Sequence, residues 1–211
     1  MKRKAIALFG TAAVLSALGA PAAYAAPPPP RGVTIETADV SGPESCEEHE
    51  LALSDDRNAF TITYSDFYVA AGGHLPWTDR KRCSILLRIL VPSDYTFGIN
   101  RVDYRGSAEL AAGAKGLMRA NIFFKGVIDP PEPRILDLKG PYSNNWTVVD
   151  EIPPDWVAYR PCGDSRGLYL DSELRVERGS SDPSKVNVIA LDSTDGSIKT
   201  TYHFAWKTCP K

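Results

Sequence analysis

Apolar and polar residues alternate along much of the chain, and this two-residue period constrains the fold more than any other feature. Phe60, Ile62 and Tyr64 alternate with threonine and serine, and residues 168–177 repeat the pattern with charged residues on the opposite face. Successive side chains of a β-strand point to opposite faces, so each segment predicts a strand with one buried face. No segment has a convincing helical period. We therefore expect an all-β protein.

Other segments predict further strands. They are residues 33–37, 118–124, 134–138, 146–149, 156–159, 185–191 and 199–206. Residues 85–91 are nearly all apolar, interrupted by Arg88, which is typical of a central strand covered on both faces. The apolar phase of residues 95–104 changes near Asn100 and Arg101, which predicts a bulge.

Two connections between these strands stand out. Asp195-Gly196 lies between the last two strands and predicts a hairpin, because a primed turn needs positive φ at its centre. Residues 108–117 are the one segment compatible with a turn of helix, and Gly113 and Gly116 oppose a longer one. Many short strands separated by turn residues predict an antiparallel β-sandwich, either jelly-roll or immunoglobulin-like.

The first 25 residues have the pattern of a signal peptide. Basic residues at positions 2–4 precede an apolar run too short to span a bilayer as an anchor, and an Ala-Tyr-Ala motif predicts cleavage after Ala25. A buried N-terminal helix is the alternative, which the four following prolines oppose. We expect residues 26–32 to be a proline-rich leader and residues 33–211 a single sandwich domain. The protein is then secreted, extracellular and monomeric, with no membrane anchor.

The cysteine pattern predicts two disulfides. Cys46, Cys83, Cys162 and Cys209 lie far apart, with no Cys-x-x-Cys spacing and no histidine at a zinc-ligand offset. Export leads to an oxidising compartment, where such cysteines pair. Four cysteines allow three connectivities. We favour Cys46–Cys83 and Cys162–Cys209, because each pair then brackets a continuous group of strands.

Charge and motifs exclude several function classes. Removing the three basic residues of the signal takes the net charge from −2 to −5, and the remaining lysines and arginines are scattered apart from residues 80–82. This distribution predicts no nucleic-acid partner. The chain has no His-Glu-x-x-His, phosphate-loop or dinucleotide motif, so we expect no cofactor and no bound metal. Of the three histidines, His49, His74 and His203, we interpret His203 as a hydrogen-bonded structural residue.

One segment has the composition of a ligand site. Residues 140–146 combine two aromatic side chains with amides in an expected loop, and such groups stack on sugar rings and hydrogen-bond hydroxyls. Tyr142, Asn144 and Trp146 are therefore the candidate binding residues. The alternative is an aromatic plug that closes the end of the sandwich. Asn145 also begins a glycosylation sequon, which matters where the host modifies such sites.

Acidic residues provide two weaker candidates. Asp171 and Glu173 share one strand face, a spacing that sets an acid beside a base as in retaining glycosidases, although charge alternation on a solvated face explains them equally well. Asp192 and Asp195 offer oxygen ligands for calcium, but the segment lacks the spacing and final glutamate of an EF-hand loop. A hairpin turn is the favoured interpretation there.

Several strings resemble a family of small secreted bacterial and fungal proteins, the domain of unknown function 4360. They are Asn-Ala-Phe-Thr-Ile-Thr-Tyr-Ser at residues 58–65, Val-Asp-Tyr-Arg-Gly at 102–106, Gly-Pro-Tyr-Ser at 140–143, Pro-Cys-Gly at 161–163, and residues 192–198 leading to Tyr-His-Phe-Ala-Trp-Lys-Thr-Cys at 202–209. The resemblance covers roughly residues 33–209. It supports the disulfide pairing proposed above, and it implies no catalytic residue.

These observations lead to one expectation and two alternatives. We expect a non-catalytic secreted protein that binds a cell-surface, glycan or protein partner through Tyr142, Asn144 and Trp146. The first alternative is a secreted hydrolase that uses carboxylates on a sheet face, such as Asp171 and Glu173. The second is a structural or inhibitory secreted protein.

Overall fold

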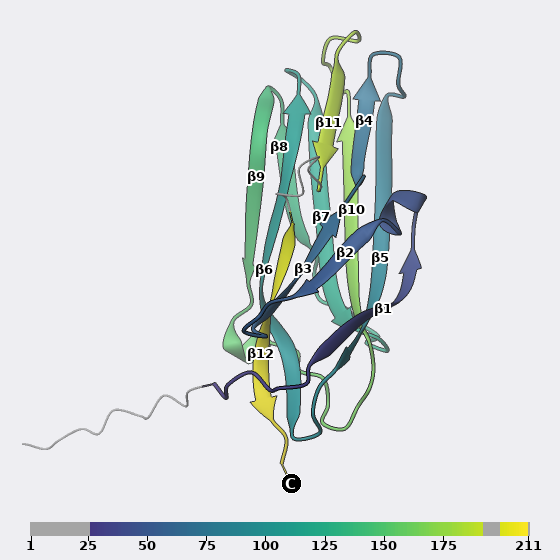
Figure 1. Cartoon of the computed structure of the whole chain (residues 1–211). Helices are drawn as coiled ribbons and strands as arrows, with labels where there is room; N and C mark the ends of the chain where they lie inside the picture. The colour runs from purple at the N-terminus through teal and green to yellow at the C-terminus, as the bar shows by residue number, and fades with distance from the viewer. Residues whose placement is uncertain (1–25, 192–198, 211) are drawn as a thin grey trace, which may run out of the picture.

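The computed structural model describes residues 26–191 and 199–210. The predicted signal peptide, and Asp192 and Asp195 with their candidate calcium site, lie outside these residues. Two antiparallel sheets face each other and form a sandwich (Figure 1). The prediction of an all-β antiparallel sandwich is therefore confirmed.

The five-stranded sheet draws its strands from distant parts of the chain. In spatial order they are β1 (Thr34–Ser41), β5 (Thr78–Leu90), β10 (Leu168–Glu177), β7 (Lys115–Phe124) and β8 (Arg134–Lys139). Only β7 and β8 are both neighbours in sequence and partners in this sheet. The chain therefore crosses repeatedly between the two layers.

The seven-stranded sheet forms the second layer. Its order is β2 (His49–Leu53), β3 (Ala59–Tyr64), β12 (Thr200–Thr208), β6 (Tyr95–Leu110), β11 (Val186–Ala190) and β4 (Tyr68–Gly72), with β9 (Tyr142–Glu151) also paired to β6. Two short 3-10 helices, η1 (Glu44–Cys46) and η2 (Pro154–Trp156), lie in connections. Among the described residues, neither helix has the length and hydropathy that crossing a bilayer requires.

The core lies between the two sheets and is rich in aromatic side chains. Phe60 and Tyr202, on the paired strands β3 and β12, stack with ring centroids 4.8 Å apart. Ile85, Leu87 and Leu174 on the opposite sheet are fully buried. Each such side chain contributes about 1.5–3 kcal/mol through burial. The alternating residues seen in the sequence thus supply the inner faces of both sheets.

Several local predictions are confirmed. The β6–β12 register runs from His203 opposite Arg101 to Phe204 opposite Ile99, so Asn100 is the extra residue of a bulge. Both disulfides form with the favoured pairing, Cys46–Cys83 and Cys162–Cys209.

Other local predictions are wrong. The strands that flank Asp195-Gly196 do not form a hairpin, because β11 and β12 each pair with a different part of β6. Residues 108–117 contain no helix; β6 and β7 meet there in a tight turn, with Gly113 at φ +91°. Residues 156–159 do not form a strand, since η2 occupies their start and Tyr159 makes an isolated bridge.

The apolar segment 85–91 is only partly covered on both faces. Ile85, Leu86 and Leu87 are buried in succession, but Leu90 is 50% exposed. Residues 85–90 form the last part of the longer strand β5, which lies between β1 and β10. On its outer face Leu86 is buried, whereas Arg88 and Leu90 are exposed, so this face is only partly covered.

Candidate functional site

The outer face of the five-stranded sheet carries three rows of side chains, each built from β5, β10 and β7. Register places these residues directly opposite one another, and side chains two apart on a strand share a face. The rows are Leu86–Tyr169–Phe123, Ser84–Asp171–Asn121 and Arg82–Glu173–Arg119. We call these nine residues the outer patch.

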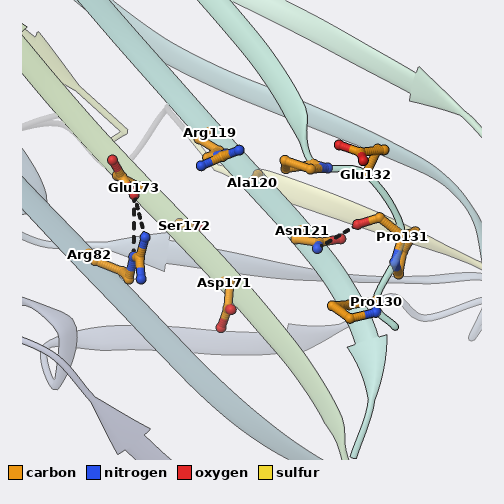
Figure 2. Close-up of a pocket in the computed structure, with 11 residues that line it drawn as sticks. Arg82, Arg119, Ala120, Asn121, Pro130, Pro131, Glu132, Asp171, Ser172 and Glu173 are labelled. Atoms are coloured by element: carbon orange, nitrogen blue, oxygen red, sulfur yellow. Dashed lines mark hydrogen bonds and ion pairs between the residues drawn. The ribbon is translucent and has the colours of Figure 1, made fainter. Parts of the chain in front are cut away.

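The residues of the second and third rows, except Ser84, line an open groove of about 280 Å³ (Figure 2). The segment 130–133 between β7 and β8 forms its wall. Three of its four residues are prolines, whose fixed φ limits the movement of this wall. Asn121 fastens the wall to β7, because its Nδ2 donates a hydrogen bond of 2.8 Å to the carbonyl of Pro131.

The first row extends the groove with an aromatic surface. The rings of Phe123 and Tyr169 have centroids 5.4 Å apart and planes inclined by 32°. Both side chains are partly exposed, whereas Leu86 beside Tyr169 is 8% exposed. The two rings therefore present a continuous, accessible apolar surface on a rigid sheet.

The third row contains a carboxylate held by two arginines. Arg80 donates to both oxygens of Glu173 at 2.7 Å. Arg82 Nη2 donates to Glu173 Oε2 at 2.8 Å (Figure 2). The Glu173 side chain is only 9% exposed. Burial raises the pKa of this carboxyl group, but the hydrogen bonds and charges of both arginines outweigh burial, so the pKa lies below its ordinary value. Glu173 stays ionised.

The contacts of Glu173 do not fit the hydrolase alternative. Asp171 and Glu173 do lie on one face of β10, as expected, and both line the groove. A retaining or inverting glycosidase needs one carboxyl group with a raised pKa as the proton donor. The pKa of Glu173 is instead lowered, and both of its carboxylate oxygens already accept hydrogen bonds from arginines. Asp171 accepts a hydrogen bond of 2.6 Å from the Ser84 hydroxyl. Glu173 is therefore not suited to the role of proton donor.

The three residues selected from the sequence lie elsewhere. Tyr142, Asn144 and Trp146 belong to β9 in the seven-stranded sheet, so the prediction of a loop is wrong. Trp146 is 5% exposed and packs against Gly106, where an added Cβ would overlap the indole ring. Its ring has no free face for a ligand. Tyr142 is partly exposed and Asn144 is exposed, but neither reaches the outer patch.

The outer patch was missed because its rows join segments far apart in sequence. Alternation placed Tyr169, Asp171 and Glu173 on one face of a strand. Nothing in the sequence paired that strand with the one that carries Phe123. The aromatic pair became visible only when register brought the two strands together.

Two of the three histidines are held by hydrogen bonds. His203 Nε2 lies 2.8 Å from Asp103 Oδ2, and Arg101 binds the other oxygen of Asp103 at 2.8 Å. His49 contacts the Cys46 carbonyl at 2.9 Å. His74 is exposed in the turn between β4 and β5. Within the part of the chain that the structure describes, no group of three or more metal-ligating side chains gathers.

A Gly-x-Ser-x-Gly stretch at residues 163–167 also matches a hydrolase motif. In hydrolases that motif places its serine on a sharp turn between a strand and a helix. Here it lies in the connection between η2 and β10, with Asp164 bound to Arg166 at 2.7 Å. The structural context of a nucleophile elbow is therefore missing from this connection.

Comparison with known proteins identifies the family. The family described as "Domain of unknown function (DUF4360)" matches residues 31–209. The chain belongs to this family. A relative from Arthroderma benhamiae, described as an uncharacterized secreted protein, is 27% identical to the DUF4360 chain over 158 residues, which cover 74% of the chain and 63% of the relative. The DUF4360 chain is a secreted protein, as its N-terminal pattern predicted.

Two solved structures of carbohydrate-binding modules match this chain at low similarity. TmCBM61 in complex with β-1,4-galactotriose has a TM-score of 0.28 at 8% identity, covering 81% of this chain and 88% of the module. TmCBM27, described for mannan recognition, has a TM-score of 0.32 at 9% identity with the same coverage. These scores are too low to transfer a ligand or a site to the DUF4360 chain.

Proposed function

We propose that this secreted protein binds a glycan through the outer patch. The observation that carries the proposal is the accessible Phe123–Tyr169 ring pair, continuous with a groove lined by polar side chains. Aromatic rings pack against the apolar faces of sugar rings, and carboxylate, amide and guanidinium groups hydrogen-bond their hydroxyls. The outer patch supplies all four kinds of group on neighbouring strands.

The dimensions of the patch favour an oligosaccharide over a single sugar. Phe123 and Arg119 lie four residues apart on β7, which corresponds to about 13 Å along the strand. The groove is also open to solvent rather than enclosed, so a chain can enter and leave at its ends. Because its side chains stand on three paired strands, the site is preorganised and binding requires little ordering.

Affinity electrophoresis of the secreted protein through gels containing a panel of soluble polysaccharides tests this proposal. At least one polysaccharide should retard the wild type. Tyr169→Ala should weaken binding about tenfold, which corresponds to about 1.4 kcal/mol, because it removes half of the stacking surface. Phe123→Ala should have a similar effect.

Trp156→Ala is the matched control. Trp156 is 81% exposed on η2, so it is the most exposed tryptophan among the described residues and the strongest rival aromatic contact. Its substitution should leave retardation unchanged. The proposal fails if Trp156→Ala abolishes binding while Tyr169→Ala does not, or if no polysaccharide retards the wild type.

A further inference from the structure

Arg119 occupies an unusual electrostatic position in the outer patch. It stands directly opposite Glu173 across β7 and β10, where an ion pair is the expected arrangement. Both oxygens of Glu173 are instead taken by Arg80 and Arg82. Among residues 26–191 and 199–210, Arg119 takes part in none of the ion pairs. This cation lines the groove without a partner (Figure 2).

The charges are separated along the groove. In the third row Arg82 and Arg119 flank Glu173, and Arg80, one row further along β5 and outside the groove, is a third cation close to this carboxylate. Toward the aromatic row lies Asp171, and Glu132 lies on the wall. A ligand that carried negative charge on every sugar would meet these two carboxylates. A ligand with a single anionic group near Arg119 and neutral sugars beside it would not.

We infer that the glycan bound by the outer patch contains an acidic sugar next to neutral sugars, and that Arg119 binds its carboxylate. This inference rests on the proposed function. A guanidinium presents paired N–H donors that match the two oxygens of a carboxylate. The neutral sugars then lie over Asp171, Asn121 and the Phe123–Tyr169 rings. Arg119 is the specificity-determining residue and the aromatic row supplies the common stacking surface.

The test compares one oligosaccharide with and without its charge. The probe is a hyaluronate hexasaccharide, in which a uronic acid alternates with a neutral sugar, and its carboxyl-reduced form. Isothermal titration at low salt should show at least tenfold weaker binding of the wild type to the reduced form. Arg119→Gln should bind both forms about equally, at the affinity of the wild type for the reduced form. Arg119→Lys should restore part of the preference.

Arg88→Gln is the matched control. Arg88 lies on the outer face of the same sheet, is similarly exposed, and is already paired with Glu36 at 2.6 Å. The variant should keep the wild-type preference. Polygalacturonate, which is charged on every sugar, should bind more weakly than the hyaluronate probe.

The outcomes separate this inference from the proposed function. If the wild type binds both hexasaccharides equally, or if Arg119→Gln keeps the preference, the inference is wrong while glycan binding stands. If polygalacturonate binds more tightly than the alternating probe, the requirement for neutral neighbours is wrong. If neither hexasaccharide nor any polysaccharide of the panel binds, both the inference and the proposed function fall.

Discussion

At the scale of single residues, the outer patch depends on how Glu173 is held. Two arginines share one carboxylate that is almost fully shielded from water, and this arrangement fixes Arg80 and Arg82 at the edge of the groove. It also leaves Arg119 without a partner. We propose that this unpaired cation, held beside an anion whose oxygens are already bound, meets the charged group of the ligand.

Glu173→Gln should lower the free energy of unfolding by about 1.5–3 kcal/mol at pH 7, the range of charge-assisted hydrogen bonds. The pKa of Glu173 is depressed in the folded state, so its stabilising effect is present above the ordinary value of 4.5 and is lost as pH falls through the folded-state pKa. Urea denaturation of both proteins between pH 7 and pH 3 measures this difference.

Glu177→Gln serves as the control for that experiment. Glu177 pairs with Arg175 on the same strand face at 2.6 Å, but the pair is more exposed. Its loss should cost less than about 1 kcal/mol. A Glu173→Gln variant that is as stable as the wild type at pH 7, or a difference that grows as the pH falls, would contradict the account of Glu173.

At the scale of elements, the sequence predicted most strands but few of their partners. A two-residue period shows which face of a segment is buried, and it says nothing about which other segment lies beside it. The expected hairpin at Asp195-Gly196 illustrates that local sequence does not determine which strands pair. Its turn chemistry is favourable, yet β6 is long enough to pair with both flanking strands in succession, and this tertiary pairing determines the arrangement.

The edge strand β9 shows why the binding residues selected from the sequence were placed in a loop. Glycine, proline and amides at residues 140–145 are typical of a loop, but ten residues of β9 pair with β6. Trp146 anchors this strand by filling the space above Gly106. The aromatic plug, the alternative interpretation of this segment, describes Trp146 better than ligand contact does.

Trp146→Ala should therefore lower the free energy of unfolding by about 3–5 kcal/mol, the usual cost of emptying a buried aromatic site. Asn144→Ala, on the same strand but exposed, should change it by less than about 0.5 kcal/mol. Denaturant titrations followed by circular dichroism measure both values. A stable Trp146→Ala protein that had lost glycan binding would instead place the site on β9.

At the scale of the whole molecule, secretion is consistent with a scaffold held together by disulfides. Secretion favours oxidation of all four cysteines, and each disulfide ties a connection to a strand: Cys46–Cys83 joins η1 to β5, and Cys162–Cys209 joins the segment before β10 to the end of β12. Loops of this size stabilise a fold by roughly 4 kcal/mol in the chain-entropy description. The sandwich therefore offers a rigid, extracellular face on which β5, β10 and β7 present the outer patch.

We propose that the glycan binds to this face and to no other. The most direct measurement is a titration of ¹⁵N-labelled protein with an oligosaccharide from a polysaccharide that retards it, followed by amide chemical shifts. We predict that the largest changes lie on β7 and β10 around Phe123, Tyr169 and Arg119, with little change on β9 or η2. Changes concentrated on β9, or around Trp156, with β7 and β10 unaffected, would show that the glycan binds elsewhere.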